Sequence, residues 1–451
     1  MAPVKKSPFS FLNIRLFIAF RILFNARFYY PVFTVLFIDY GLTIEQFAIL
    51  NAVWAMTIVI AEVPSGALAD VVGRKKVLVI TTGLMIAEMV LLAFVPLGNS
   101  ALIFSVFLLN RILSGLAEAM ASGADEAIAY DTLVEKGDPK DWPKVLSLQM
   151  RLRSIATIIS VTAGALIYDS VAMNKILNCL GSDIILNQQT TMRFPIYITL
   201  ILGILAFTTV MMMKEKANSD SDEQYDIAEA LKKTLQAGRW ILATPFALAI
   251  IMITMTYDHT LRMIVTMTSQ YYRVIGLPDA IFGVLGAGMA VLGLMMPKIA
   301  EHMADRFSAR VNIGIIGLMG LFGLIGLTSF SAISGILAMT FIFAGLTLTS
   351  FFTSHYLNRI SSSDIRATVL SFKGLAFNLA YGIIGVLFAT LMTGLRETVA
   401  LETPDFNTLQ VENSAFQAAI GWFPWYLFIL MILLYFYCHK KLQNEPDSPN
   451  S

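Results

Sequence analysis

The chain has 451 residues, of which 57% are hydrophobic and only 14% charged, and its formal net charge is +1. Soluble domains carry about 25% charged residues, so this composition excludes an ordinary soluble protein. A net charge so close to zero also offers no basic field for nucleic acid. Twelve apolar stretches follow one another along the chain, each close to the ~20 residues that a helix needs to cross a bilayer. They begin near residues 12, 47, 77, 101, 146, 194, 241, 279, 311, 333, 366 and 421. The sequence therefore predicts an all-α integral membrane protein with twelve transmembrane helices.

Basic residues gather on alternate connections between these spans. Arg74, Lys75 and Lys76 follow span two, and Lys214 and Lys216 follow span six, whereas the loops DYGLTIEQ and PLGNS contain no lysine or arginine. Loops rich in lysine and arginine stay on the cytoplasmic side of a membrane. We therefore expect a multi-pass protein of the cell (inner) membrane with both termini in the cytoplasm.

The most polar segment, KEKANSDSDEQYDIAEALKKTLQAGR, occupies positions 214–239. It follows span six and precedes span seven. The chain thus divides into a six-helix half at 1–213, a cytoplasmic linker at 214–239 and a second six-helix half at 240–451. A short pattern recurs at the same place in both halves, because Ala69-Asp70 and Ala304-Asp305 are each followed by basic residues. Such parallel repeats are typical of transporters whose pseudo-symmetric halves rock around a central site.

The first copy of this pattern, GALADVVGRKKVL at positions 66–78, lies between spans two and three. It resembles the loop motif of the major facilitator superfamily, which reads Gly-x-Leu-Ala-Asp-Arg-x-Gly-Arg-Lys, and it departs from that motif at Val71. The span count, the central linker and the half-repeat extend the resemblance to the whole chain. The resemblance implies a twelve-helix transporter that works by alternating access.

The resemblance also implies a latch at the cytoplasmic ends of the helices. Gly66 would let a neighbouring helix approach closely, Asp70 would accept hydrogen bonds from a helix N-terminus across the two halves, and Gly73 would permit a tight turn. The basic residues of the loop would pair with acids at the inner end of span four. The alternative is that these bases only hold the loop inside. The predicted latch residues are Gly66, Asp70, Gly73, Arg74, Lys75, Asp125, Glu126 and, from the degenerate second copy, Asp305, Arg306 and Arg310.

Span four contains RILSGLAEA, which resembles a second motif of the same family with Arg111, Gly115 and Ala119 in place. An arginine inside a membrane costs at least about 2.5–3.5 kcal/mol on insertion scales, so Arg111 must face a cavity or a partner. Glu118 lies seven residues further on and hence on roughly the same helix face. Arg111 and Glu118 form a candidate proton-responsive pair, with a purely structural salt bridge as the alternative.

By resemblance, spans one, four, seven and ten line the central path. Several charges on these and neighbouring spans can be paired or free: Asp258 and Arg262 are spaced to neutralise each other, and Glu88 could act as a coupling carboxylate or pair with a base from another helix. A mild surplus of cations would suit an anionic or zwitterionic substrate. The predicted cavity residues are Arg21, Asn25, Arg27, Glu88, Arg111, Glu118, Asp258, His259, Arg262, Lys373 and Asn378.

These observations favour a secondary active transporter for a small molecule, driven by a proton gradient and with export as the first direction. An importer of an organic anion or zwitterion is the alternative, and a non-transporting membrane sensor is a third reading. An enzyme is not expected, because the sequence has no H-E-x-x-H or G-x-S-x-G motif and its four histidines lie on different segments without metal-ligand spacing. We expect no cofactor or metal, no nucleic-acid partner, and a monomer in the lipid bilayer.

Overall fold

Twelve helical segments that are long and apolar enough to cross a membrane make up most of the part of the chain that the structure describes. The computed structural model describes residues 7–121, 123–215, 227–362 and 365–443, and within these ranges every regular element is a helix. The prediction of an all-α protein with twelve spans is confirmed. The apolar runs become helices because a backbone in lipid must satisfy its hydrogen bonds within one segment.

The first half comprises spans one to six. Its elements are η1 (Pro8–Ser10), α1 (Leu12–Asn25), η2 (Tyr30–Val32), α2 (Phe33–Asp39), α3 (Ile44–Val72), α4 (Arg74–Phe94), α5 (Ser100–Ala121), α6 (Ala124–Lys136), η3 (Pro139–Asp141), α7 (Trp142–Tyr168), α8 (Ser170–Cys179), α9 (Gln188–Thr191) and α10 (Phe194–Met212). The second half comprises spans seven to twelve and is preceded by α11 (Ile227–Ala243). Its elements are α12 (Pro245–Thr266), α13 (Thr268–Val274), α14 (Asp279–Arg306), α15 (Ala309–Leu327), α16 (Ala332–Ile360), α17 (Arg366–Glu402) and α18 (Thr408–Gln443).

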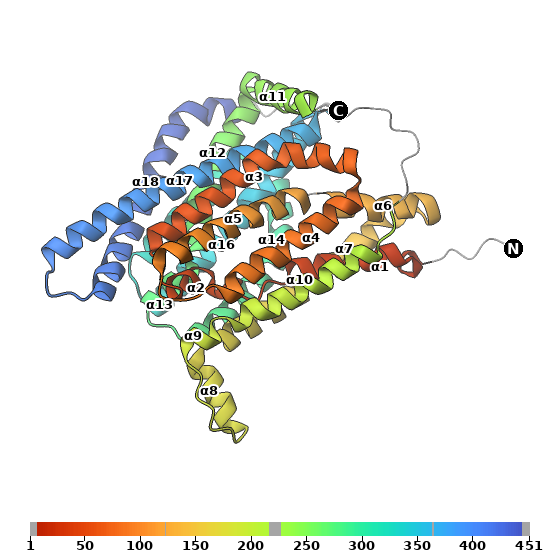
Figure 1. Ribbon diagram of the computed structural model, residues 1–451. Helices are drawn as coiled ribbons and strands as arrows, with labels where there is room; N and C mark the ends of the chain where they lie inside the picture. The colour runs from red at the N-terminus through yellow and green to blue at the C-terminus, as the bar shows by residue number, and fades with distance from the viewer. Residues whose placement is uncertain (1–6, 122, 216–226, 363–364, 444–451) are drawn as a thin grey trace.

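An even number of spans brings the start of α1 and the end of α18 to the same end of the bundle, here named the termini end (Figure 1). The loop between α3 and α4 and the helix α11 also lie there. The other end, here named the opposite end, carries the loops that follow α2 and α4, and α8 projects from the bundle on this side. The two ends provide the frame in which the functional residues are placed.

Spans one and seven, which occupy corresponding positions in the two halves, are both broken helices. Span one stops at Asn25 and resumes at Tyr30, and its break packs so closely on α7 that a Cβ atom added to Gly164 would lie 1.8 Å from the carbonyl oxygen of Phe28. Pro31 supports the break because it has no backbone N–H to donate. Span seven breaks at Met267, between α12 and α13. Paired interruptions of this kind point to a binding site between the halves.

The last helix begins earlier than the sequence predicts. The apolar run suggests a start near residue 421, but α18 begins at Thr408, and together with the 37-residue α17 it forms a hairpin that reaches past its neighbours at the opposite end (Figure 1). Arg396 of α17 donates hydrogen bonds to Glu45 of α3 and to Glu412 of α18. These ion pairs stabilise polar turns that hydropathy alone does not assign to a span.

Candidate functional site

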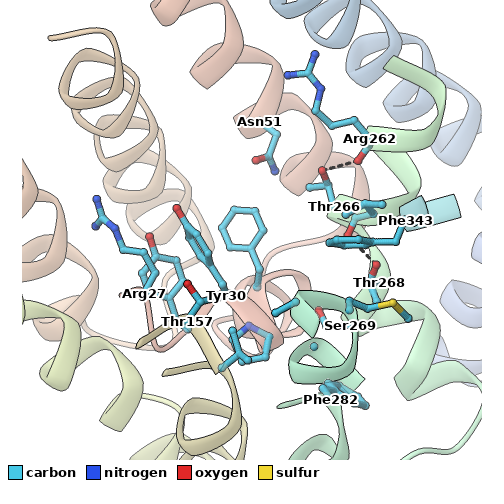
Figure 2. Close-up of a pocket in the computed structure, with 18 of the residues that line it drawn as sticks. Arg27, Tyr30, Asn51, Thr157, Arg262, Thr266, Thr268, Ser269, Phe282 and Phe343 are labelled. Atoms are coloured by element: carbon cyan, nitrogen blue, oxygen red, sulfur yellow. Dashed lines mark hydrogen bonds between the residues drawn. The ribbon is translucent and has the colours of Figure 1, made fainter. Parts of the chain in front are cut away.

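A cavity of about 570 Å³ lies between the two halves at the level of the two helix breaks (Figure 2). Most of its wall is apolar and aromatic, with Phe33, Trp54, Phe282 and Phe343 among the rings. Its polar lining consists of Arg27, Tyr29, Tyr30, Asn51, Arg111, Ser114, Glu118, Thr157, Arg262, Thr266, Thr268, Ser269, Tyr272 and Tyr381. A largely apolar pocket with a few convergent polar groups is the usual form of a small-molecule site.

The broken segments place polar groups in this cavity. The break in span one presents Tyr30, whose side chain is 55% exposed although it lies deep in the bundle, because the exposed part faces the cavity. The break in span seven presents Thr268 and Ser269 from the other half (Figure 2). The hydroxyl of Thr268 donates to the carbonyl oxygen of Val265 at 2.7 Å, and Ser269 accepts from the N–H groups of Thr34 and Val35, so both hydroxyls are held in place at the centre of the protein.

Arg27 is neutralised by a carboxylate from a different helix. Its Nη1 atom lies 2.7 Å from Oε1 of Glu88 on α4, and both side chains are buried. Of the two roles that the sequence leaves open for Glu88, pairing with a base of another helix is the one observed. The pair adds no net charge to the cavity.

Arg262 is neutralised in the same way on the opposite wall. It forms an ion pair with Asp258, one turn earlier on α12, and it donates 3.0 Å hydrogen bonds to Oδ1 of Asn378 and to the carbonyl oxygen of Phe377. Its guanidinium group also lies 4.5 Å from the ring centroid of Tyr381. The self-neutralising reading of the Asp258–Arg262 spacing is therefore correct.

Among the residues that the structure describes, no carboxylate pairs with Arg111. Its Nε and Nη2 atoms donate to Oδ1 of Asn110 at 3.1 and 2.9 Å, and the Asn110 amide donates in turn to the backbone oxygen of Glu88. Arg111 as a whole residue is 4% exposed, and its guanidinium group faces the ring of Phe33. It is a nearly buried cation in the cavity wall.

Glu118 does not form the ion pair with Arg111 that the sequence suggests. Seven residues of helix separate the two Cα atoms by about 10 Å along the axis, and the guanidinium group of Arg111 is turned to Oδ1 of Asn110 instead. Glu118 is exposed to the cavity, and within the described residues no hydrogen bond or ion pair is found for it. The prediction that both residues share one helix face is confirmed, but the expected pair is wrong.

Other predicted cavity residues lie outside the lining. Arg21 turns toward the termini end, where it pairs with Asp125 at 2.5 Å and Glu126 at 2.6 Å, and the amide of Asn25 donates to the carbonyl oxygen of Arg21. His259 is held between the carbonyl oxygen of Met255 and the hydroxyl of Tyr426. Lys373 donates to Ser354 at 3.3 Å. These side chains face neighbouring helices because the rotation of each span about its axis is set by packing.

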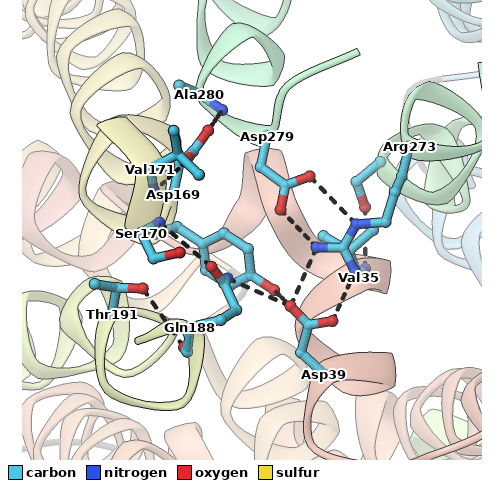
Figure 3. Close-up of polar contacts among 12 residues, drawn as sticks. Val35, Asp39, Asp169, Ser170, Val171, Gln188, Thr191, Arg273, Asp279 and Ala280 are labelled. Atoms are coloured by element: carbon cyan, nitrogen blue, oxygen red, sulfur yellow. Dashed lines mark hydrogen bonds and ion pairs between the residues drawn. The ribbon is translucent and has the colours of Figure 1, made fainter. Parts of the chain in front are cut away.

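A cluster of ion pairs closes the opposite end of the bundle (Figure 3). Arg273, just after α12, donates to Asp39 of the first half at 2.6 Å and to Asp279 of its own half at 2.6 Å, and Tyr168 donates its hydroxyl to Asp39. We name Asp39, Tyr168, Arg273 and Asp279 the opposite-end clasp. Burial disfavours the charge on Arg273, but its hydrogen bonds to Asp39 and Asp279 outweigh this effect and raise the pKa of the guanidinium group.

Backbone contacts reinforce this closure. The hydroxyl of Thr34 in α2 donates to the carbonyl oxygen of Thr266 at 2.6 Å, and the Thr34 N–H donates to Ser269 at 3.0 Å. Asp169 accepts a 3.1 Å hydrogen bond from the N–H of Ala280 at the start of α14 (Figure 3). All three contacts join one half to the other. The chain is therefore held with the opposite end closed.

At the termini end, the loop predicted as a latch forms contacts within the first half. Gly73 has φ +98°, as the predicted turn requires. Arg74 pairs with Asp131 at 2.7 Å, while Asp125 and Glu126 are occupied by Arg21, so the expected pairing with the loop is only partly correct. Lys75 donates its ammonium group to the carbonyl oxygen of Met211.

The other latch predictions have different outcomes. A Cβ atom on Gly66 would meet no described residue within 4 Å, so none of the described helices approaches it closely in this state. The side chain of Asp70 lies outside the described residues, and its role stays a prediction. In the second copy, Arg310 packs on Tyr435 with its guanidinium carbon 5.8 Å from the ring centroid, whereas Asp305 and Arg306 are exposed at the end of α14.

A family profile described as Major Facilitator Superfamily matches residues 16–386 of this chain. The chain belongs to the major facilitator superfamily. Its fold supports the same assignment, since this chain is similar over its whole length to transporters of known structure. A comparison with curated proteins finds no match in sequence.

Three solved structures illustrate the similarity of this superfamily member to known transporters. A bacterial homologue of the human lysosomal transporter Spinster, inward-facing and unoccupied, shares 13% identity, covers 99% of this chain and 100% of its own, and has a TM-score of 0.73. A mutant of the nucleoside transporter NupG shares 12% identity over 94% of this chain and 99% of its own, with a TM-score of 0.69. The xylose transporter XylE from E. coli, in an inward open conformation, shares 14% identity over 99% and 98% of the two chains, with a TM-score of 0.62. At these identities the likeness establishes the fold, an alternating-access transporter fold.

Several residues that line the cavity of this superfamily member are not found by sequence reasoning. Asn51, Thr266, Ser269, Tyr272 and Tyr381 line the cavity, yet isolated polar residues in apolar spans give no signal of direction. The residues of the opposite-end clasp are also not found by sequence reasoning. Their signal is visible in retrospect, because Asp39 and Arg273 stand at the same end of spans one and seven, which the half-repeat makes equivalent.

Proposed function

We propose that this protein is a proton-coupled secondary active transporter of the cell (inner) membrane that exports a small solute. The two halves, at 1–213 and 240–451, rock about the central cavity, with 214–239 as the cytoplasmic linker between them. Each chain contains a complete cavity with walls from both halves, which supports a monomer as the working unit.

The single observation that carries the proposal is the carboxylate of Glu118 in the cavity. Arg27 and Arg262 are each neutralised by an acid, whereas Glu118 faces the cavity with no cation of the described residues within ion-pair distance. A charge enclosed by protein and lipid is costly unless it is paired or neutralised. Glu118 can be neutralised either by a proton or by a cationic group of the solute. Because one carboxylate serves both, binding of the solute releases the proton and the two fluxes become opposed.

The direction of transport and the orientation of the protein rest on the sequence. The motifs that begin at Gly66 and Arg111 resemble those of drug and metabolite exporters, and the basic residues of the termini end support its cytoplasmic placement. With the opposite end closed, the cavity then faces the cytoplasm, where an exporter takes up its solute.

Reconstituted protein in liposomes with a pH-sensitive dye inside provides the test. Lipophilic cations, organic anions and zwitterions are added in turn, and solute-driven proton flux is recorded. We expect Glu118→Gln to abolish the coupled proton flux while exchange of labelled solute continues, because an amide cannot exchange a proton. The matched variant Glu135→Gln, which removes an exposed carboxylate of α6 far from the cavity, should behave as wild type. Unchanged proton flux in Glu118→Gln would refute the coupling role.

A second candidate is import of an organic anion or zwitterion. The observation that favours it is Arg111, a cation of the cavity wall that no carboxylate in the described part of the chain neutralises. The same liposomes separate the two directions. An importer coupled to protons accumulates its solute on the side toward which protons flow, whereas an exporter moves solute against the proton flux. A protein that binds a solute and moves none would be a sensor.

A further inference from the structure

The free charges of the cavity are one cation and one anion on the same helix. Three of the six charged groups at or beside the cavity wall are arginines and three are carboxylates, and two pairs of them cancel: Arg27 with Glu88, and Arg262 with Asp258. Arg111 and Glu118 remain, and neither has a partner of opposite charge within the described part of the chain. The lining residues and their ion-pair partners therefore carry no surplus of either sign, whereas the cationic surplus expected from sequence also counts Arg21 and Lys373, which lie outside the lining.

These two charges form a stripe along α5. Arg111, Ser114 and Glu118 follow one another at intervals of three and four residues, which places them on one helix face, and all three line the cavity. Seven residues correspond to two turns and about 10 Å along the axis. The stripe thus presents a guanidinium group, a hydroxyl group and a carboxylate in a row.

The surroundings of Arg111 indicate that its missing partner is a ligand. The residue is 4% exposed, its Nε and Nη2 atoms share one amide oxygen, and Phe33 and Phe37 cover it with ring centroids at 5.3 and 5.5 Å. A nearly buried guanidinium group without a carboxylate is costly. Elsewhere in the same cavity this protein supplies a carboxylate for each arginine, so its absence here leaves a place for an anionic group.

Aromatic rings occupy the space beside this stripe. Tyr30 projects into the cavity, and Trp54 and Phe343 contribute further ring faces from α3 and α16. The hydroxyl groups of Thr268 and Ser269 lie on the wall of the second half (Figure 2). A solute that fits this arrangement has a flat apolar body with one charged group at each end.

We propose that the solute is an amphipathic zwitterion whose anionic group binds Arg111 and whose cationic group binds Glu118, with a planar apolar body between them. This assignment rests on the proposed function, since it names the substrate class of the same cavity. It goes beyond that function in fixing both signs and their spacing. The two charged groups of such a solute are far apart. This separation distinguishes it from α-amino acids, in which the ammonium and carboxylate groups are attached to the same carbon atom.

Three forms of one compound test the proposal by calorimetric and thermal-shift titration of the purified full-length protein. The zwitterion is 4-(4-aminobutyl)benzoate, which has an ammonium group at the end of the butyl chain and a carboxylate on the ring. Its methyl ester is a cation, and its N-acetyl derivative is an anion of similar size. We expect the zwitterion to bind about tenfold or more tightly than either singly charged form, which corresponds to 1.4 kcal/mol or more. An equimolar mixture of the ester and the N-acetyl form should not reproduce this affinity.

Variants assign each charge to its residue. In Arg111→Gln the zwitterion should bind no better than its methyl ester, and in Glu118→Gln no better than its N-acetyl form. Arg151→Gln and Glu135→Gln, which remove exposed charges outside the cavity, should retain the full preference. The unliganded melting temperature of each variant shows that it is folded, and rescue of the Arg111 variant by Arg111→Lys separates charge from packing.

Two results would overturn the proposal: equal binding of a singly charged form by the wild type, or no binding of any of the three forms. Flux of the same compounds through proteoliposomes is measured separately. If the zwitterion preference holds without flux, the proposed transport fails while the binding assignment stands. If a singly charged solute drives proton flux and the zwitterion does not bind, the assignment fails while transport stands.

Discussion

Arg273 and Asp39 join the two halves of the protein at its opposite end, with Nη1 of the arginine 2.6 Å from Oδ1 of the carboxylate. The same guanidinium group holds Asp279 at the start of α14. Asp39 in turn accepts the hydroxyl of Tyr168, so one carboxylate connects α2, α7 and α13. Since the halves must separate at this end for the cavity to open there, the proposed transport cycle requires the clasp to break.

The first prediction is that Arg273→Gln shifts the protein toward a state open at the opposite end. Removing both ion pairs should change the population ratio by about 5–150-fold, the range of coupling free energies of ~1–3 kcal/mol. Spin labels on Cys179 of α8 and on Glu402→Cys at the end of α17, in a background with Cys438→Ser, report the separation of the halves. Double electron–electron resonance should reveal a longer distance between the two labels, with a larger population in Arg273→Gln than in the wild type.

The matched control for this prediction is Arg273→Lys. A lysine keeps the charge but cannot hold two carboxylates in the forked geometry of a guanidinium group, so its effect should be smaller. Distance distributions identical to wild type in both variants would mean that the clasp does not hold the closed state.

The second prediction concerns the ion pair of Arg27 and Glu88. Arg27→Gln leaves Glu88 buried without its partner and should lower the free energy of unfolding by about 3–5 kcal/mol. The double variant with Glu88→Gln should recover most of this loss, because neither charge then remains. Thermal unfolding in detergent measures the complete double-mutant cycle. If Arg27→Gln is as stable as wild type and only solute affinity falls, Arg27 acts on the solute and not on the fold.

The number of spans and the family could be predicted because both depend on local sequence. A run of about 20 apolar residues commits a segment to the membrane wherever it lies, and the loop after span two carries its motif within ten residues. Even the common face of Arg111 and Glu118 follows from helix geometry. Partners could not be predicted in this way. Arg27 and Glu88 are 61 positions apart, and their contact depends on the path of the break in span one and on the rotation of α4 about its axis.

Arg21 illustrates where the sequence reasoning fails. It lies six residues before Arg27, and a continuous helix would already place the two side chains on different faces. The break after Asn25 also changes the direction of the chain between them. Arg27 consequently lines the cavity, while Arg21 faces Asp125 at the termini end. Helix breaks inside a span leave the hydropathy unchanged, and their effect on side-chain direction can be seen only in the folded protein.

The third prediction tests the break in span one. Gly164→Ala would place a Cβ atom 1.8 Å from the carbonyl oxygen of Phe28, and because that atom belongs to the backbone it cannot turn aside. We expect a loss of about 1–3 kcal/mol or more and loss of solute binding, as Arg27 and Tyr30 follow the displaced segment. Gly288→Ala on α14 is the control, since nothing lies within 4 Å of its added methyl group. Thermal unfolding of both variants decides the matter, and equal stability would contradict the packing argument.

The fourth prediction separates the two glycines of the loop motif. Gly73 has φ +98° and ψ 141°, a conformation that other residues adopt at a cost of about 1–3 kcal/mol. A Cβ atom there would also lie 3.1 Å from Glu215, whose carboxylate accepts hydrogen bonds from the N–H groups of Arg74 and Lys75 at the start of α4. Gly73→Ala should therefore lower the melting temperature. Gly66→Ala should not, because Gly66 lies inside α3 with open space beside it. If Gly66→Ala nevertheless slows transport without lowering stability, the close approach of helices at Gly66 belongs to the other state of the cycle, in which the termini end is closed.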